Sequence, residues 1–70
     1  MYSILIQSDA LRRIDPVWSP VDPAAEYHEQ RLASQDLAAA FQEARDWVDT
    51  LGGSPVYFLK NGKIIAEVLR

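Results

Sequence analysis

The alternation of apolar and polar residues predicts a strand at the start of the chain. The stretch Tyr2–Gln7 is short and rich in aliphatic and β-branched residues, which is typical of a strand. Its even-numbered residues would point to one face of a sheet, and its odd-numbered residues, among them Leu5, to the other. Residues 8–15 then predict a turn or a short helical turn, capped by Ser8 or Asp9.

The clearest pattern predicts an amphipathic helix from Ser34, the expected N-cap, to Leu51. Gly52 and Gly53 would cap its C-terminus, and Pro55 would prevent it from continuing. Apolar residues recur at alternating spacings of four and three, which places them in one stripe along the helix. The stripe consists of Leu37, Phe41, Ala44, Val48 and Leu51.

Residues 55–70 predict a β-hairpin, because Asn61-Gly62 separates two runs of β-forming residues and both turn residues accept a positive φ. A two-residue turn places Lys60 opposite Lys63. Regular alternation then divides the hairpin into two faces. We expect the uncharged face to lie under the helix, with Phe41 and Val48 packed on it; it consists of Tyr57, Leu59, Ile64, Ala66 and Val68.

Residues 22–34 are compatible with two structures. Asp22 followed by Pro23 is typical of a helix N-cap with proline in the first turn. The segment from Glu26 to Ala33 also reads as a polar edge strand, and we favour the strand. The prediction is therefore a single α+β domain over residues 1–70. One amphipathic helix packs on a small antiparallel or mixed sheet of three to four strands, in the order β-(β)-α-β-β with a C-terminal Asn-Gly hairpin.

One helix covers only one face of a sheet, so the other face of the hairpin needs a different cover. That face would carry Phe58, Ile65 and Leu69 among charged residues. The proline-rich segment 15–23 contains Trp18 and offers two solutions. Trp18, with Val17 and Val21, could close over this face as a lid, which we favour because small domains need every buried ring. Alternatively, Trp18 and the open face form a contact surface for another chain.

Composition narrows the classes of function. The chain has 70 residues, no cysteine and a formal net charge of −3. Seven lysines and arginines scattered along the chain do not make the basic face that nucleic-acid binding needs. We expect no disulfide and no thiolate metal site. The first residues lack the features of a signal peptide, and no apolar run is long enough to span a membrane, so we expect a cytoplasmic protein without membrane contact.

The sequence contains no pattern typical of a catalytic or metal-binding site. His28 is the only histidine, and Glu26 and Glu29 flank it, which is typical of a solvated surface residue. No histidine pair, nucleophile with a base or phosphate-binding glycine loop is present. We therefore expect no enzyme activity, no catalytic residue, no metal and no cofactor. The acidic helix face, which includes Asp36, Glu43 and Asp46, is either an ordinary solvated face or a surface for a basic partner.

These patterns favour a small non-enzymatic module that acts by protein contact, of the kind that phages and mobile elements encode as regulators or inhibitors. Self-association through the open sheet face is part of this expectation. The alternative is an accessory protein associated with nucleic acid, using the dispersed basic side chains. The residues expected to contact a partner protein, or a second copy, are Trp18, Phe58, Ile65, Leu69, Asp36, Glu43 and Asp46.

Overall fold

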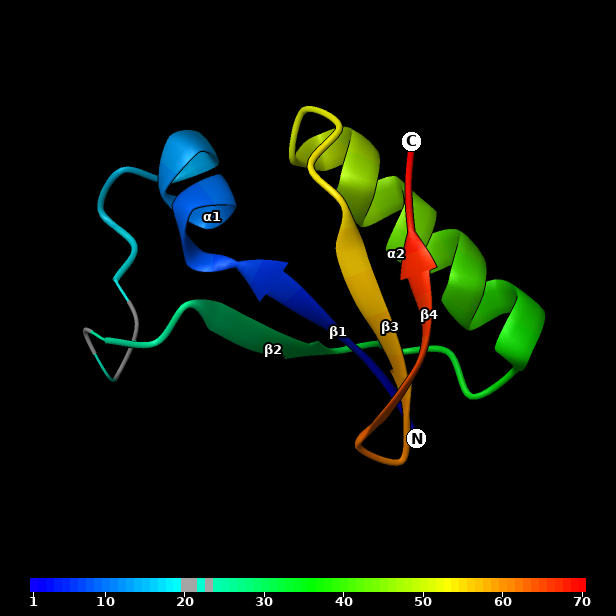
Figure 1. Cartoon of the computed structure of the whole chain (residues 1–70). Coiled ribbons are helices and arrows are strands. Elements are labelled where there is room, and N and C mark those ends of the chain that lie inside the picture. Colours follow the sequence, from blue (N-terminus) through cyan, green and yellow to red (C-terminus); the bar gives the residue numbers. More distant parts are fainter. Residues whose placement is uncertain (20–21, 23) are drawn as a thin grey trace.

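The computed structural model describes residues 1–19, 22 and 24–70, which form an antiparallel sheet and two helices (Figure 1). The sheet has four strands in the order β2-β1-β3-β4, so β2 and β4 are its edges. The predicted α+β class is confirmed, but the prediction of a single helix is wrong. In chain order the elements are β1 (Tyr2–Gln7), α1 (Ser8–Ile14), β2 (Tyr27–Arg31), α2 (Leu37–Thr50), β3 (Val56–Lys60) and β4 (Lys63–Val68).

Helix α1 follows β1 directly and has no side-chain cap. Gln7 occupies the N-cap position without a capping hydrogen bond. The Ser8 hydroxyl instead donates to the carbonyl of Ala25, so the prediction of a Ser8 or Asp9 cap is wrong. A helix of seven residues is marginal alone, and α1 is held by burial of Ala10 and Leu11 in the core.

The ambiguous segment 22–34 contains a strand, as we favoured. Strand β2 pairs with β1, and the carboxylate of Asp22 accepts a hydrogen bond from the backbone N–H of Ala24. Asp22 therefore closes a local turn rather than beginning a helix. Pro20, Val21 and Pro23 lie outside the described residues.

Helix α2 begins later than predicted, with Asp36 rather than Ser34 as its N-cap. The Asp36 carboxylate accepts a hydrogen bond of 3.1 Å from the backbone N–H of Ala39. The helix ends at Thr50, and Gly52 and Gly53 follow with φ values of 75° and 97°. These positive values are the ones for which a glycine C-cap is suited.

The core lies between α2 and one face of the sheet. Ile4 and Ile6 are fully buried there, together with Phe58 of β3. Figure 1 shows α2 running diagonally behind β3 and β4. The Phe58 ring meets Phe41 of α2 edge to face and stacks on Tyr2 of β1, with ring centroids 5.5 Å apart in both pairs.

The predicted division of the hairpin into faces is wrong for β3. Because Ile4 pairs with Phe58, and Ile4 faces the core, Phe58 lies under the helix and Tyr57 and Leu59 lie on the opposite face. The turn does place Lys60 opposite Lys63. Beyond Leu59 and Ile64 the register shifts by one residue at a β-bulge. Regular alternation from the turn could not anticipate this shift.

The bulge changes which residues of β4 face the core. Phe58 is opposite Ala66 rather than Ile65, and Val56 is opposite Val68 rather than Glu67. Ala66 and Val68 thus share the helix-facing side with Phe58 and Val56, as predicted for β4 but not for β3. Ile64, which was expected beneath the helix, is 56% exposed.

Candidate functional site

An apolar groove runs between the N-terminal half of α2 and β4. Phe58 is almost fully buried at its floor, whereas Leu37 and Ile65 remain 52% and 51% exposed. The groove has a volume of about 480 Å³. All six residues that line it are apolar: Leu37, Ala38, Phe41, Phe58, Ile65 and Ala66. This is a surface suited to apolar side chains rather than to a polar ligand.

Two small residues explain why the groove is open. The bulge places Ala66 opposite Phe58, and Ala38 lies on the facing part of α2. Neither methyl group fills the space above the aromatic pair of Phe41 and Phe58. The groove also stays open because β4 is an edge strand of the described sheet, so no further strand of that sheet lies beside Ile65.

Positive charge lies at the hairpin turn. Lys60 of β3 and Lys63 of β4 are opposite each other and exposed, and Lys63 is two residues before Ile65, which lines the groove. The ion pair found among the described residues is Arg12–Asp9, on α1, and neither lysine takes part in it. Two adjacent like charges favour an anionic partner at the turn.

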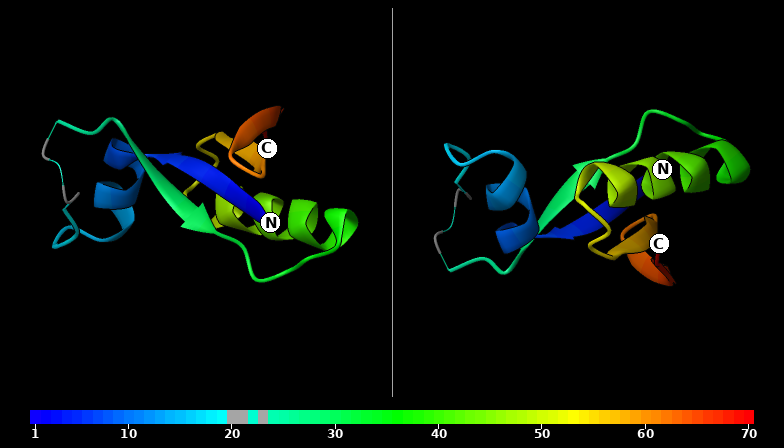
Figure 2. Two further views of the ribbon diagram at one scale, coloured as in Figure 1. Left: turned by 90° about the horizontal axis from the view of Figure 1, so that it is seen from below. Right: turned by 90° about the horizontal axis from the view of Figure 1, so that it is seen from above.

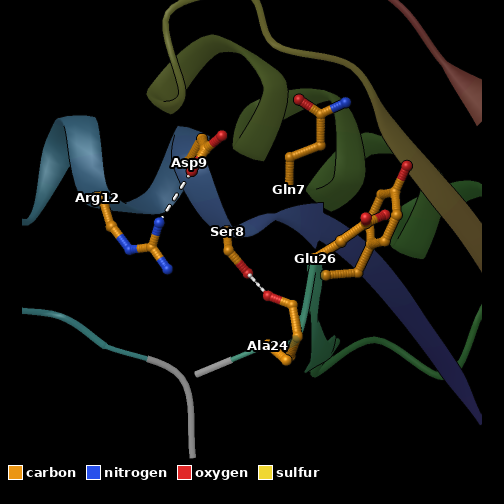
Figure 3. A pocket seen from close by; sticks show the side chains of 8 residues that line it. Gln7, Ser8, Asp9, Arg12, Ala24 and Glu26 are labelled. Atoms are coloured by element: carbon orange, nitrogen blue, oxygen red, sulfur yellow. Dashed lines mark hydrogen bonds and ion pairs between the residues drawn. The ribbon is translucent and has the colours of Figure 1, made fainter. Parts of the chain in front are cut away.

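A second, polar pocket lies between the start of α1 and the segment that leads into β2 (Figure 3). Arg12 and Asp9 form an ion pair of 2.9 Å at its wall, and the Ser8 hydroxyl donates to the Ala25 carbonyl. Arg12 and Asp9 are therefore engaged with each other, and the Ser8 hydroxyl is engaged with the backbone. The residues that line the pocket include neither a histidine nor a cysteine, so Ser8 has no side-chain base of that kind beside it.

Glu43 has a structural role. Its carboxylate accepts hydrogen bonds from the Ser34 hydroxyl and from the backbone N–H groups of Ser34 and Ala33. The Ser34 hydroxyl is the main reason that the pKa of Glu43 lies below its ordinary value; desolvation opposes this, and the two backbone donors reinforce it. Glu43 thus anchors the connection between β2 and α2.

The three acidic residues proposed as partner contacts all have hydrogen bonds within the chain. Asp36 caps α2, Glu43 holds residues 33–34, and Asp46 accepts a hydrogen bond of 3.1 Å from the Gln42 amide. Asp36 and Asp46 are nevertheless exposed. The structure does not gather these side chains and the apolar candidates into one site.

The four apolar candidates are also separated. Ile65 lines the groove and Leu69 is 60% exposed, but Phe58 is only 1% exposed and is part of the core. Phe58 is therefore not on the open face, contrary to prediction. The reason is its pairing with Ile4, which orients it toward α2.

Trp18 does not act as the predicted lid over Phe58, Ile65 and Leu69. It is partly buried against the edge of the main core, and its ring meets His28 of β2 edge-on at 5.6 Å. Val17 beside it is 91% exposed, and Val21 lies outside the described residues. His28 is half-buried rather than solvated, because the indole covers it.

Leu37, Ala38 and Phe41 were missed as parts of a surface site. Helical periodicity assigned Leu37 and Phe41 to the buried stripe, but α2 begins at Leu37. Its first turn leaves Leu37 half-exposed and Phe41 only partly buried. The available clue was Asp36, a good N-cap residue, whose carboxylate accepts from the Ala39 N–H and so sets the later helix start.

Comparisons with known proteins identify no relative: no family model, curated protein or solved structure matches this chain. Among residues 1–19, 22 and 24–70, no cluster of three or more potential metal-ligating side chains is found. Neither helix in the described part of the chain has the length and apolarity needed to cross a lipid bilayer.

Proposed function

We propose that this protein is a protein-contact module that binds an apolar segment of another protein in the groove between α2 and β4. The observation that carries the proposal is the groove itself, where Leu37 and Ile65 stay half-exposed above the Phe41–Phe58 pair. A domain of this size has few apolar residues to spare from its core. A continuous apolar hollow on such a surface is typical of an interaction site.

The charges at the hairpin turn define the chemistry of the partner segment. Lys60 and Lys63 form no ion pair with the described residues, and Lys63 precedes the groove residue Ile65 by two positions on β4. A segment that places leucine, isoleucine or an aromatic ring in the groove and an aspartate or glutamate beside the lysines matches both features. Charge complementarity of this kind raises the association rate and orients the partner.

Binding without catalysis is part of the proposal. In the second pocket Arg12 is paired with Asp9 and the Ser8 hydroxyl with the Ala25 carbonyl, and the groove contains no side chain able to transfer a proton or attack a substrate. A ligand in the groove would therefore be held by apolar contacts and oriented by the lysines.

Selection from a random-sequence peptide library tests the proposal. Immobilised wild-type protein would be panned against the library, with the bare matrix used to remove peptides that do not bind the protein. We expect the retained peptides to combine two or three apolar residues with an adjacent aspartate or glutamate. Affinities would then be measured by fluorescence polarisation on the purified, folded variants.

Matched variants separate the groove from the rest of the surface. Ile65→Lys and Leu37→Lys should weaken peptide binding by about tenfold or more, since they place a charge in an apolar contact. Ile64→Lys is the control, because Ile64 is equally exposed on the same strand but does not line the groove. Peptides that bind wild type and Ile65→Lys alike would contradict the proposal. So would a salt-sensitive preference for oligonucleotides over every peptide.

A further inference from the structure

Strand β2 presents an unprotected edge on the side of the sheet opposite β4. Seen from below in Figure 2, β2 lies in front of the other helices and strands of the described part of the chain. The β4 edge is interrupted by the bulge, whereas the pairing of β2 with β1 is regular over all five residues of Tyr27–Arg31. Proline, which often protects such edges, is absent from β2.

The backbone groups that point outward from β2 follow from its pairing with β1. The N–H of Leu32 donates to the carbonyl of Tyr2, at 3.0 Å, which makes these two residues a hydrogen-bonded pair. In an antiparallel ladder such pairs alternate with residues whose N–H and C=O groups point away. The backbone N–H and C=O groups of Gln30 therefore point to β1, and those of Glu29 and Arg31 point outward.

The charges of Glu29 and Arg31 are complementary when two copies of β2 lie side by side. In an antiparallel pair of two β2 strands related by a two-fold axis at Gln30, Glu29 of each copy lies opposite Arg31 of the other. Each such pair would exchange two backbone hydrogen bonds and add one ion pair. We propose that the β2 edge binds a second copy of this chain in this register, which joins two sheets into one of eight strands.

Both charged side chains are available for this contact. Glu29 and Arg31 are exposed, and Arg31 has no ion-pair partner in the described part of the chain. One oxygen of Glu29 accepts a hydrogen bond of 2.7 Å from the Ser3 hydroxyl, which leaves the other oxygen free. The Arg31 carbonyl accepts a hydrogen bond from the Gln30 amide, and its second lone pair can accept another.

Neighbouring symmetric registers are less favourable. A two-fold axis at Glu29 places two glutamates opposite each other, and an axis at Arg31 does the same with two arginines. An axis at His28 leaves Arg31 without an acidic residue opposite it. The contact is polar and lies on the edge far from β4, so it leaves the apolar groove unoccupied and is independent of the function proposed above.

Charge-swap variants test both the interface and its register. Sedimentation equilibrium would be run from about micromolar to about millimolar protein, for wild type and for Glu29→Arg and Arg31→Glu alone. Each single change places like charges opposite each other twice, and it should raise the dimer dissociation constant at least about tenfold. Glu67→Arg on the β4 edge is the control and should leave dimerisation unchanged. Circular dichroism melts would establish that every variant is folded.

Mixing the two single variants gives the decisive result. Glu29→Arg chains carry two arginines at the interface and Arg31→Glu chains carry two glutamates, so an equimolar mixture should associate at least as tightly as wild type. The backbone N–H groups of Glu29 and Arg31 should also exchange more slowly with solvent as concentration rises. A wild-type chain that stays monomeric throughout, or a mixture that stays dissociated, would overturn the proposal. A dimer abolished by Ile65→Lys but not by the charge swaps would place the interface in the groove and overturn it as well.

Discussion

Replacing Phe58 with leucine tests the packing of β3 against α2. Phe58 is 1% exposed, and its ring contacts Tyr2 and Phe41 at centroid distances of 5.5 Å. Leucine keeps the position apolar but removes both aromatic contacts and part of the volume. Tyr57, the neighbouring residue on β3, faces away from the helix and provides the matched control, Tyr57→Leu.

The size of the effect follows from these contacts. An aromatic pair contributes about 0.5–1.5 kcal/mol beyond its burial. Two such pairs are lost and leucine recovers most of the burial, so we expect Phe58→Leu to lower the free energy of unfolding by about 1–3 kcal/mol. In a domain of this length, each kcal/mol lowers Tm by about 4–8 °C. Complete truncation to alanine would remove about 3–5 kcal/mol, which is comparable to the whole stability of such a domain.

Urea unfolding followed by far-ultraviolet circular dichroism measures the two variants on one scale. Phe58→Leu should lower the midpoint clearly with an unchanged slope, and Tyr57→Leu should cost about half as much or less, because Tyr57 is only partly buried. The opposite order would mean that β3 presents Tyr57 to the helix. The bulge and the β1–β3 register described above would then both be incorrect.

Three further changes test local features. Asp36→Ala should lower the free energy of unfolding by about 0.5–2 kcal/mol in urea titrations, whereas Asp36→Asn, which keeps an acceptor for the Ala39 N–H, should cost less. Gly62→Ala should destabilise the hairpin by about 1 kcal/mol in the same titration, because Gly62 has a φ of 81°; wild-type stability would contradict the turn geometry. The folded-state pKa of Glu43 lies below its ordinary value of about 4.5, so its carboxylate stabilises the fold above that pH, and this contribution is lost as the pH falls through the folded pKa. Glu43→Gln should therefore lower Tm at pH 7 and reduce the difference between Tm values at pH 7 and pH 3; an unchanged difference would show that Glu43 does not contribute.

Parts of the fold were predictable because their signals are local. The first strand and the Lys60–Lys63 pairing follow from alternation and turn chemistry in a few neighbouring residues, whereas segment 22–34 was compatible with a helix as well as with the strand that it contains. Helix α1 was expected only as a turn or a short helical turn, because a seven-residue helix without a side-chain cap has only a weak local signal. Of the residues expected to contact a partner, Ile65 lines the groove and Leu69 is exposed, while Phe58 is a core residue; contact of Ile65 or Leu69 with a partner stays a prediction.

The sequence by itself determined the class of fold, the extent of the amphipathic helix to within a turn, and the β-hairpin. Each of these depends on contacts between residues close together in the chain. Only the tertiary structure decided which face of β3 meets α2, because Phe58 is oriented by its pairing with Ile4, more than fifty positions away. The groove and the free edge of β2 were decided in the same way. They result from strand order and from one bulge, and both depend on which distant strands pair.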